Sequence, residues 1–220
     1  MAPELNRIER PPIDRFLGKR KLFLVPLVYE PPTDVEEGQE ILARYWDQAQ
    51  QQVTYLESRL GASQLIFHEG LTSGGNAGLQ SLEPMGQQSY ALVEAKCKKG
   101  AILEATEDSE LLNEMIDLQR CLMLPFQSNK IAHQLQVWLD ESIRTRYDHI
   151  ASRINSSIRD GQVGLLLINE RHQVQFPSDL EVIFVSPPAL DEYQRWLTNW
   201  IKNQNTMENT DSQSEPTDSE

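Results

Sequence analysis

Two histidines and a glutamate stand just after strand-like apolar runs of this 220-residue sequence. His68 and Glu69 follow the run QLIF at residues 64–67, and His172 lies in the polar turn after VGLLLI at residues 163–168. If these runs are parallel strands, their carboxyl ends meet at one edge of a sheet, where ligands bind in such folds. Imidazole and carboxylate groups are ligands of zinc, manganese or iron, and a spare carboxylate can act as a general base. His68, Glu69 and His172 are therefore candidate metal ligands.

Polar residues also follow the other apolar runs, namely Tyr29, Glu30, Glu104, Asp108, Glu170 and Arg171. The alternative interpretation is that polar residues gather there only because loops begin there, so that a lone histidine is solvated or structural. The chain lacks the motifs of nucleotide-binding loops, serine hydrolases and zincin proteases: G-x-x-x-x-G-K-[ST], G-x-G-x-x-G, G-x-S-x-G and H-E-x-x-H. The sequence therefore does not support a nucleotide-binding protein, a serine hydrolase or a zincin protease.

The apolar runs alternate with segments of helical period, which is the pattern of a parallel sheet covered by crossover helices. We therefore predict an α/β fold with a mainly parallel sheet flanked by helices. Strands are expected at residues 21–29, 64–67, from 100 onward, 163–168 and 180–185. Helices are expected at residues 35–60, 79–99 with breaks at Pro84 and Gly86, 109–124, 128–158 and around 193–201. Asp34 is the expected N-cap of the first helix and Gly61 its C-cap.

The longest expected helix has an apolar stripe that we interpret as core, formed by Ile131, Leu135, Leu139, Ile143, Tyr147, Ile150, Ile154 and Ile158. Residues 1–14 form an expected N-terminal extension and residues 15–203 a single α/β domain. Residues 204–220 are polar and acidic, so we predict a disordered tail.

The formal net charge of -13 disfavours binding to nucleic acid, since a phosphate backbone would be repelled. No apolar run reaches the roughly 20 residues needed to cross a bilayer, and the first residues lack a secretory signal, so we expect no membrane span and a cytoplasmic location. Cys97 and Cys121 have no metal-type spacing, and we expect no disulfide.

Three segments together resemble the TraB/TIKI group and its relatives of the erythromycin esterase and ChaN type. The first leads from LFLVPLVY through the helix at residues 35–60 to LIFHEG, so that Glu69 takes the place of the family's glutamate. The second is RYDHIASRI, which is similar to a family helix that begins with arginine, here Arg146. The third is VGLLLINERHQVQFPSDLEVIFV, in which His172 matches the histidine of a G-x-x-H motif, although Asn169 stands where glycine is usual.

The resemblance implies a metal-assisted hydrolase of peptidase or esterase type. In it, His172 and Glu69 bind a divalent metal, zinc or manganese, or activate water, and Arg146 orients the substrate. One departure weighs against this activity. The family's hydrolases carry another G-x-x-H after the first strand, where this chain reads Pro26, Leu27, Val28, Tyr29. Either His68 substitutes for the missing histidine or no metal binds.

Two functions therefore remain open from the sequence. One is the hydrolase, acting on a small molecule or peptide that the sequence does not identify. The other is a non-catalytic binding or assembly protein on the same α/β scaffold, whose acidic surface and tail meet a protein partner.

Overall fold

A computed structural model describes residues 16, 18–32 and 34–211, with side chains as far as 204. Its centre is a parallel sheet of five strands in the order β3-β2-β4-β1-β5. The strands are β1 (Arg20–Leu27), β2 (Leu65–His68), β3 (Ile102–Leu103), β4 (Val163–Asn169) and β5 (Leu180–Phe184). The α/β class with a parallel sheet is thereby confirmed.

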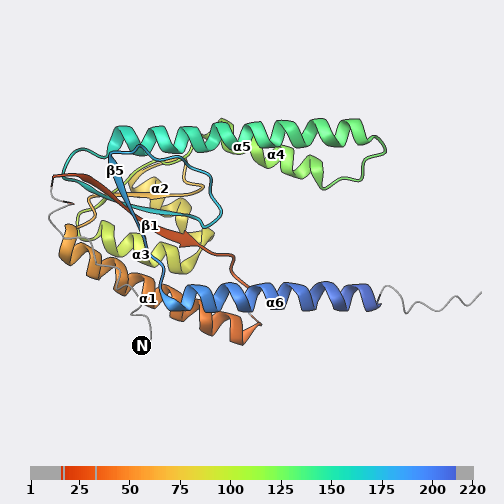
Figure 1. Cartoon of the computed structure of the whole chain (residues 1–220), viewed down its shortest axis with the longest axis horizontal. Coiled ribbons are helices and arrows are strands. Elements are labelled where there is room, and N and C mark those ends of the chain that lie inside the picture. Colours follow the sequence, from red (N-terminus) through yellow and green to blue (C-terminus); the bar gives the residue numbers. More distant parts are fainter. Residues whose placement is uncertain (1–15, 17, 33, 212–220) are drawn as a thin grey trace, which may run out of the picture.

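Helices cover both faces of the sheet (Figure 1). On one face lie α1 (Glu36–Leu60), α2 (Gly75–Leu82), the short 3₁₀ helix η2 (Glu83–Met85), α3 (Gln87–Cys97) and α6 (Pro188–Asp211). On the other face lies α5 (Asn129–Ser157), with α4 (Ser109–Leu122) packed along it. The central strands β1 and β4 are buried almost throughout because both of their faces are covered, which explains their continuous apolar runs.

Alternation along each strand divides the core into two layers. In β2, Leu65 and Phe67 pack toward α5, whereas Ile66 packs toward α1 and α3. Successive side chains of a strand point to opposite faces, so His68 and Glu69 leave the sheet on different sides.

The apolar stripe of α5 is only partly core, which corrects the prediction. Leu139, Ile150, Ile154 and Ile158 are buried, but Ile131 is 51% exposed. The 29-residue helix is about 44 Å long at 1.5 Å per residue, whereas the seven-residue strand β4 spans about 23 Å. The first half of α5 therefore extends beyond the sheet together with α4, none of whose residues is buried (Figure 1).

Several helix ends differ from the predicted ones. Val35, not Asp34, is the N-cap of α1, and it makes no side-chain cap bond. Val35 O accepts the first hydrogen bond of the helix, from the Gln39 N–H at 3.1 Å, whereas Asp34 lies in the turn that precedes it. Gly61 is the C-cap as predicted, with a φ of 108° that favours glycine. α4 ends at Leu122, two residues before the predicted end.

Helix α6 continues to Asp211, so the expected domain end at 203 falls inside it. Disorder of residues 204–220 stays a prediction, and the N-terminal extension 1–14 and residues 212–220 lie outside the described residues. In the described part of the chain, every helix is too short or too polar to cross a membrane.

Candidate functional site

Two adjacent interior strands of the sheet, β1 and β4, send the chain to opposite faces where they end. After β1 the chain leads to α1, whose Ile41 and Leu42 pack in one layer of the core. After β4 it leads to Val174, which packs in the other layer beside α5. Adjacent parallel strands whose connections diverge in this way leave a crevice beyond their carboxyl ends, where ligands bind in α/β proteins.

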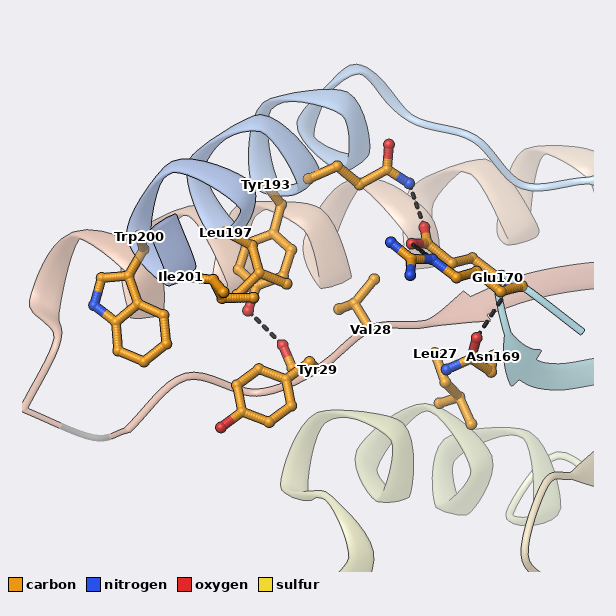
Figure 2. Close-up of a pocket in the computed structure, with 11 residues that line it drawn as sticks. Leu27, Val28, Tyr29, Asn169, Glu170, Tyr193, Leu197, Trp200 and Ile201 are labelled. Carbon is orange, nitrogen blue, oxygen red and sulfur yellow. Dashed lines mark hydrogen bonds and ion pairs between the residues drawn. The ribbon is translucent and has the colours of Figure 1, made fainter. Parts of the chain in front are cut away.

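A pocket of about 420 Å³ lies at this point, and we call it the edge pocket (Figure 2). Its volume is within the range of small-molecule sites. It is formed by the last residues of β1 and β4, by the residues that follow them and by one side of α6: Leu27, Val28, Tyr29, Asn169, Glu170, Arg171, Tyr193, Gln194, Leu197, Trp200 and Ile201.

Two side-chain hydrogen bonds fasten α6 over the edge pocket. The Tyr193 hydroxyl donates to Tyr29 O, and Gln194 Nε2 donates to a Glu170 carboxylate oxygen (Figure 2). Burial, helped by the charge of Glu30, raises the pKa of Tyr193, so its hydroxyl stays a donor. These bonds hold in place the apolar side of α6 that lines the pocket, which is formed by Leu197, Trp200 and Ile201.

A buried ion-pair triad lies on the α5 side of the same sheet edge. Arg146 of α5 donates through Nε to Glu107 Oε2 at 2.9 Å and through Nη2 to Glu107 Oε1. The same Nη2 donates to Glu69 Oε1 at 2.9 Å. Arg146 is 4% exposed and the Glu107 side chain 0%. The guanidinium thus joins α5 to the segments that follow β2 and β3.

The triad's carboxylates are already paired with donors. Glu69 Oε2 accepts from the backbone N–H of Asn169 at 2.7 Å, and Glu107 Oε1 accepts from that of Gly70 at 3.0 Å. Burial would lower the pKa of the Arg146 guanidinium, but its hydrogen bonds to Glu107 and Glu69 and their charges outweigh this and raise it. Arg146 is therefore a fixed cation whose charge is neutralised within the protein.

His172 lies on the same side of the sheet as the triad. Its ring packs edge-on against Phe176 at 5.9 Å between centroids, and its Nδ1 accepts from the Val174 N–H at 3.2 Å. Burial lowers the pKa of His172, and the nearby charge of Glu69 partly offsets this. Because Nδ1 is an acceptor, the neutral ring carries its proton on Nε2, which makes Nε2 a donor rather than a metal ligand.

His68 lies on the opposite side of the sheet from Glu69. Its backbone N–H donates to Thr106 Oγ1, and its Nδ1 lies 2.6 Å from Glu69 O, so the ring proton is on Nδ1. Burial lowers the pKa of His68. Its Nε2 keeps a lone pair and has no hydrogen-bond partner among the described residues.

The predicted site residues thus fall into two groups. Glu69, Arg146 and His172 lie together, whereas His68 faces away. Among the side chains that the structure describes, which end at residue 204, the acidic, histidine and cysteine residues form no group of three that could hold a metal ion. Glu69 also has both oxygens engaged by Arg146 and Asn169, so the predicted ligand set of His68, Glu69 and His172 does not fit a metal.

Sequence reasoning missed Glu107 and the contribution of α6. Glu107 follows the third strand, as do Glu104 and Asp108, and its position there was the available signal. Leu197, Trp200 and Ile201 have helical spacing, which predicts an apolar face but not whether that face is covered.

Comparisons of the chain with family models, with curated proteins and with solved structures gave no match.

Proposed function

We propose that this protein binds a small molecule of largely apolar surface in the edge pocket. The observation that carries this proposal is the position of an apolar pocket at the divergence of β1 and β4. The binding-protein interpretation is favoured over catalysis because the nearby carboxylates Glu69 and Glu107 are occupied by Arg146 and backbone donors.

The lining of the edge pocket indicates how such a ligand would lie. Trp200, Leu197 and Val28 offer apolar surface to the body of the ligand. Asn169 and Arg171 add polar atoms to the lining. Burial of apolar ligand surface supplies about 25 cal/mol per Å², so the aromatic and aliphatic wall provides most of the affinity.

Nile red, a neutral apolar dye whose emission rises in apolar surroundings, tests this proposal. Ile201 of α6 is 43% exposed and lines the edge pocket. Ile131 of α5 is similarly exposed, at 51%, but does not line this pocket. We expect Ile201→Glu to weaken dye binding by about tenfold, because it places a charge in an apolar wall. Ile131→Glu is the matched control and should bind as the native chain does. Equal affinity of both variants would contradict the proposal.

A second candidate function is the metal-assisted hydrolase, of peptidase or esterase type, that the family resemblance implies. The observation that favours it is the grouping of Glu69, Arg146 and His172 on one side of the sheet edge. In this interpretation the His172 ring would have to release the Val174 N–H so that a ring nitrogen is free to bind the metal, and Arg146 would orient the substrate. The pairing of both carboxylates counts against it.

Metal analysis separates the two functions. After purification without chelator, zinc, manganese or iron near one equivalent, lost in His172→Ala but kept in His133→Ala, would support the hydrolase. Metal below about a tenth of an equivalent in the native chain would count against it. Residence in the cytoplasm, expected from the sequence, stays a prediction.

A further inference from the structure

A second cavity, of about 450 Å³, lies beside the end of β1. We call it the His68 cavity. It shares Leu27, Val28 and Tyr29 with the edge pocket, but its other walls come from α1, the end of β2, η2 and α3: Glu30, Trp46, His68, Glu69, Gly70, Met85 and Ser89. It is therefore a separate compartment across the segment that leaves β1.

Two buried side chains of the His68 cavity carry polar atoms without partners. His68 is 3% and Trp46 5% exposed. In the part of the chain that the structure describes, neither His68 Nε2 nor Trp46 Nε1 has a hydrogen-bond partner. Buried polar atoms are nearly always paired, because an unmade hydrogen bond costs free energy. Because His68 and Trp46 both line this cavity, a ligand that enters it can supply the partners of both nitrogens.

The two atoms have opposite requirements. Trp46 Nε1 carries a hydrogen and can only donate. His68 Nε2 holds a lone pair and accepts, because Nδ1 is the nitrogen that faces Glu69 O at 2.6 Å. A hydroxyl group meets both requirements, as a water molecule does, since its oxygen accepts one hydrogen bond and its hydrogen makes another. The cavity, at about 450 Å³, also has room for the carbon skeleton of an alcohol.

We propose that the His68 cavity binds an alcohol, whose hydroxyl oxygen accepts from Trp46 Nε1 and whose hydroxyl hydrogen is donated to His68 Nε2. Both nitrogens are covered in this conformation, so a wall of the cavity moves when the ligand enters. Met85 can move, because it is 48% exposed and its side chain is flexible. This site does not depend on the edge pocket being occupied.

Cyclohexanol is a suitable probe, and nuclear magnetic resonance of the ¹⁵N-labelled full-length protein is the readout. We expect cyclohexanol to shift the indole N–H signal of Trp46 and the Nε2 signal of His68. Cyclohexanone has the same ring but only an acceptor oxygen, so it should bind about tenfold more weakly.

Two variants complete the test. Trp46→Phe removes the donor but keeps an aromatic ring, and it should weaken cyclohexanol binding about fivefold to tenfold. Trp138→Phe is the matched control, since Trp138 lies exposed on α5 outside the cavity. Equal affinity of Trp46→Phe and the native chain, or of the alcohol and the ketone, would overturn the proposal. If cyclohexanol shifted the indole N–H signal of Trp200 alone, the probe would lie in the edge pocket, and this result would also overturn the proposal.

Discussion

At the scale of single residues, some polar side chains near the sheet edge have hydrogen-bond partners, and others have a polar atom without one among the described residues. Glu69 and Glu107 are conspicuous in the sequence as acids near strand ends, yet Arg146 and backbone donors occupy their oxygens. His68 and Trp46 are buried as well, but among the described residues one nitrogen of each has no hydrogen-bond partner. Free polar atoms, rather than chemically reactive residue types, therefore mark the places where a ligand can be recognised.

Arg146→Met tests the structural role of the triad. The substitution leaves Glu107 buried without its cation, and breaking a buried pair in this way costs about 3–5 kcal/mol. Urea unfolding at pH 7 should show a loss of that size. Adding Glu107→Gln to this variant should recover part of the stability, because the unpaired charge is removed.

Arg120→Met is the control for this prediction, since Arg120 forms an exposed pair with Asp117 at 3.2 Å. Exposed pairs contribute less than about 1 kcal/mol. A loss in Arg146→Met as small as in Arg120→Met would mean that the triad does not hold α5 against the sheet.

At the scale of elements, one ion pair joins α1 to α3. Lys96 Nζ donates to Glu57 Oε2 at 2.5 Å, and the Ser63 N–H donates to Oε1 of the same carboxylate at 3.3 Å. Burial would raise the pKa of the Glu57 carboxyl, but hydrogen bonds from Lys96 and Ser63 and the charge of Lys96 lower it overall from 4.5. The ionised form is therefore favoured in the folded protein.

The lowered pKa of Glu57 predicts a pH dependence of stability. Above pH 4.5, its ordinary value, both the folded and the unfolded chain have this group ionised and its contribution is complete. As the pH falls below that value, the unfolded chain binds a proton first, and the contribution is lost as pH passes the folded pKa. Urea unfolding from pH 6 to pH 3 should therefore show a smaller fall in the free energy of unfolding for Glu57→Gln than for the native chain.

Glu40→Gln is the control, because Glu40 is exposed on the same helix. Its free energy of unfolding should fall as that of the native chain does. An equal fall in all three proteins would rule out the contribution of Glu57.

The two halves of α5 should respond differently to the same substitution. Ile150 is fully buried against the sheet, so Ile150→Ala should lower the free energy of unfolding by about 2–4 kcal/mol. Ile131 is largely solvated, and Ile131→Ala should cost less than about 0.5 kcal/mol. Chemical denaturation of both variants measures the difference. A comparable loss at Ile131 would show that the projecting half of α5 is covered in solution.

At the scale of the whole molecule, α6 completes one layer of the core. Tyr193 is fully buried, and Trp196 lies against α1 where Gly38 has no side chain to exclude its ring. Trp196 Nε1 donates to Glu37 Oε2 at 3.1 Å. α6 also supplies one side of the edge pocket, so removing this helix would remove part of this core layer and part of the site.

Two truncations test the contribution of the C-terminal region. Ending the chain before Pro188 should unfold or aggregate it, because several large side chains lose burial worth about 1.5–3 kcal/mol each. Ending it after Lys202 should leave the melting temperature nearly unchanged, since the acidic residues beyond have little apolar area to bury. A comparable loss on the second truncation would mean that residues 203–220 are docked.

The sequence by itself determined the class of fold and the places of the strands. Strands buried on both faces give continuous apolar runs, and crossover helices give period 3.6, so LFLVPLVY and VGLLLI predict β1 and β4 from local pattern alone. Because parallel strands end at one edge, the sequence also placed Glu69 and His172 on the same edge of the sheet.

Only the tertiary structure decided which of these residues meet. Glu107 and Arg146 are 39 positions apart and become partners because α4 and α5 fold back on each other beside the sheet. The strand order, which no local pattern encodes, puts β1 beside β4 and so creates the edge pocket. Burial of an apolar face is likewise decided by length: α5 is longer than the sheet it covers, and the same stripe is core at Ile150 and surface at Ile131.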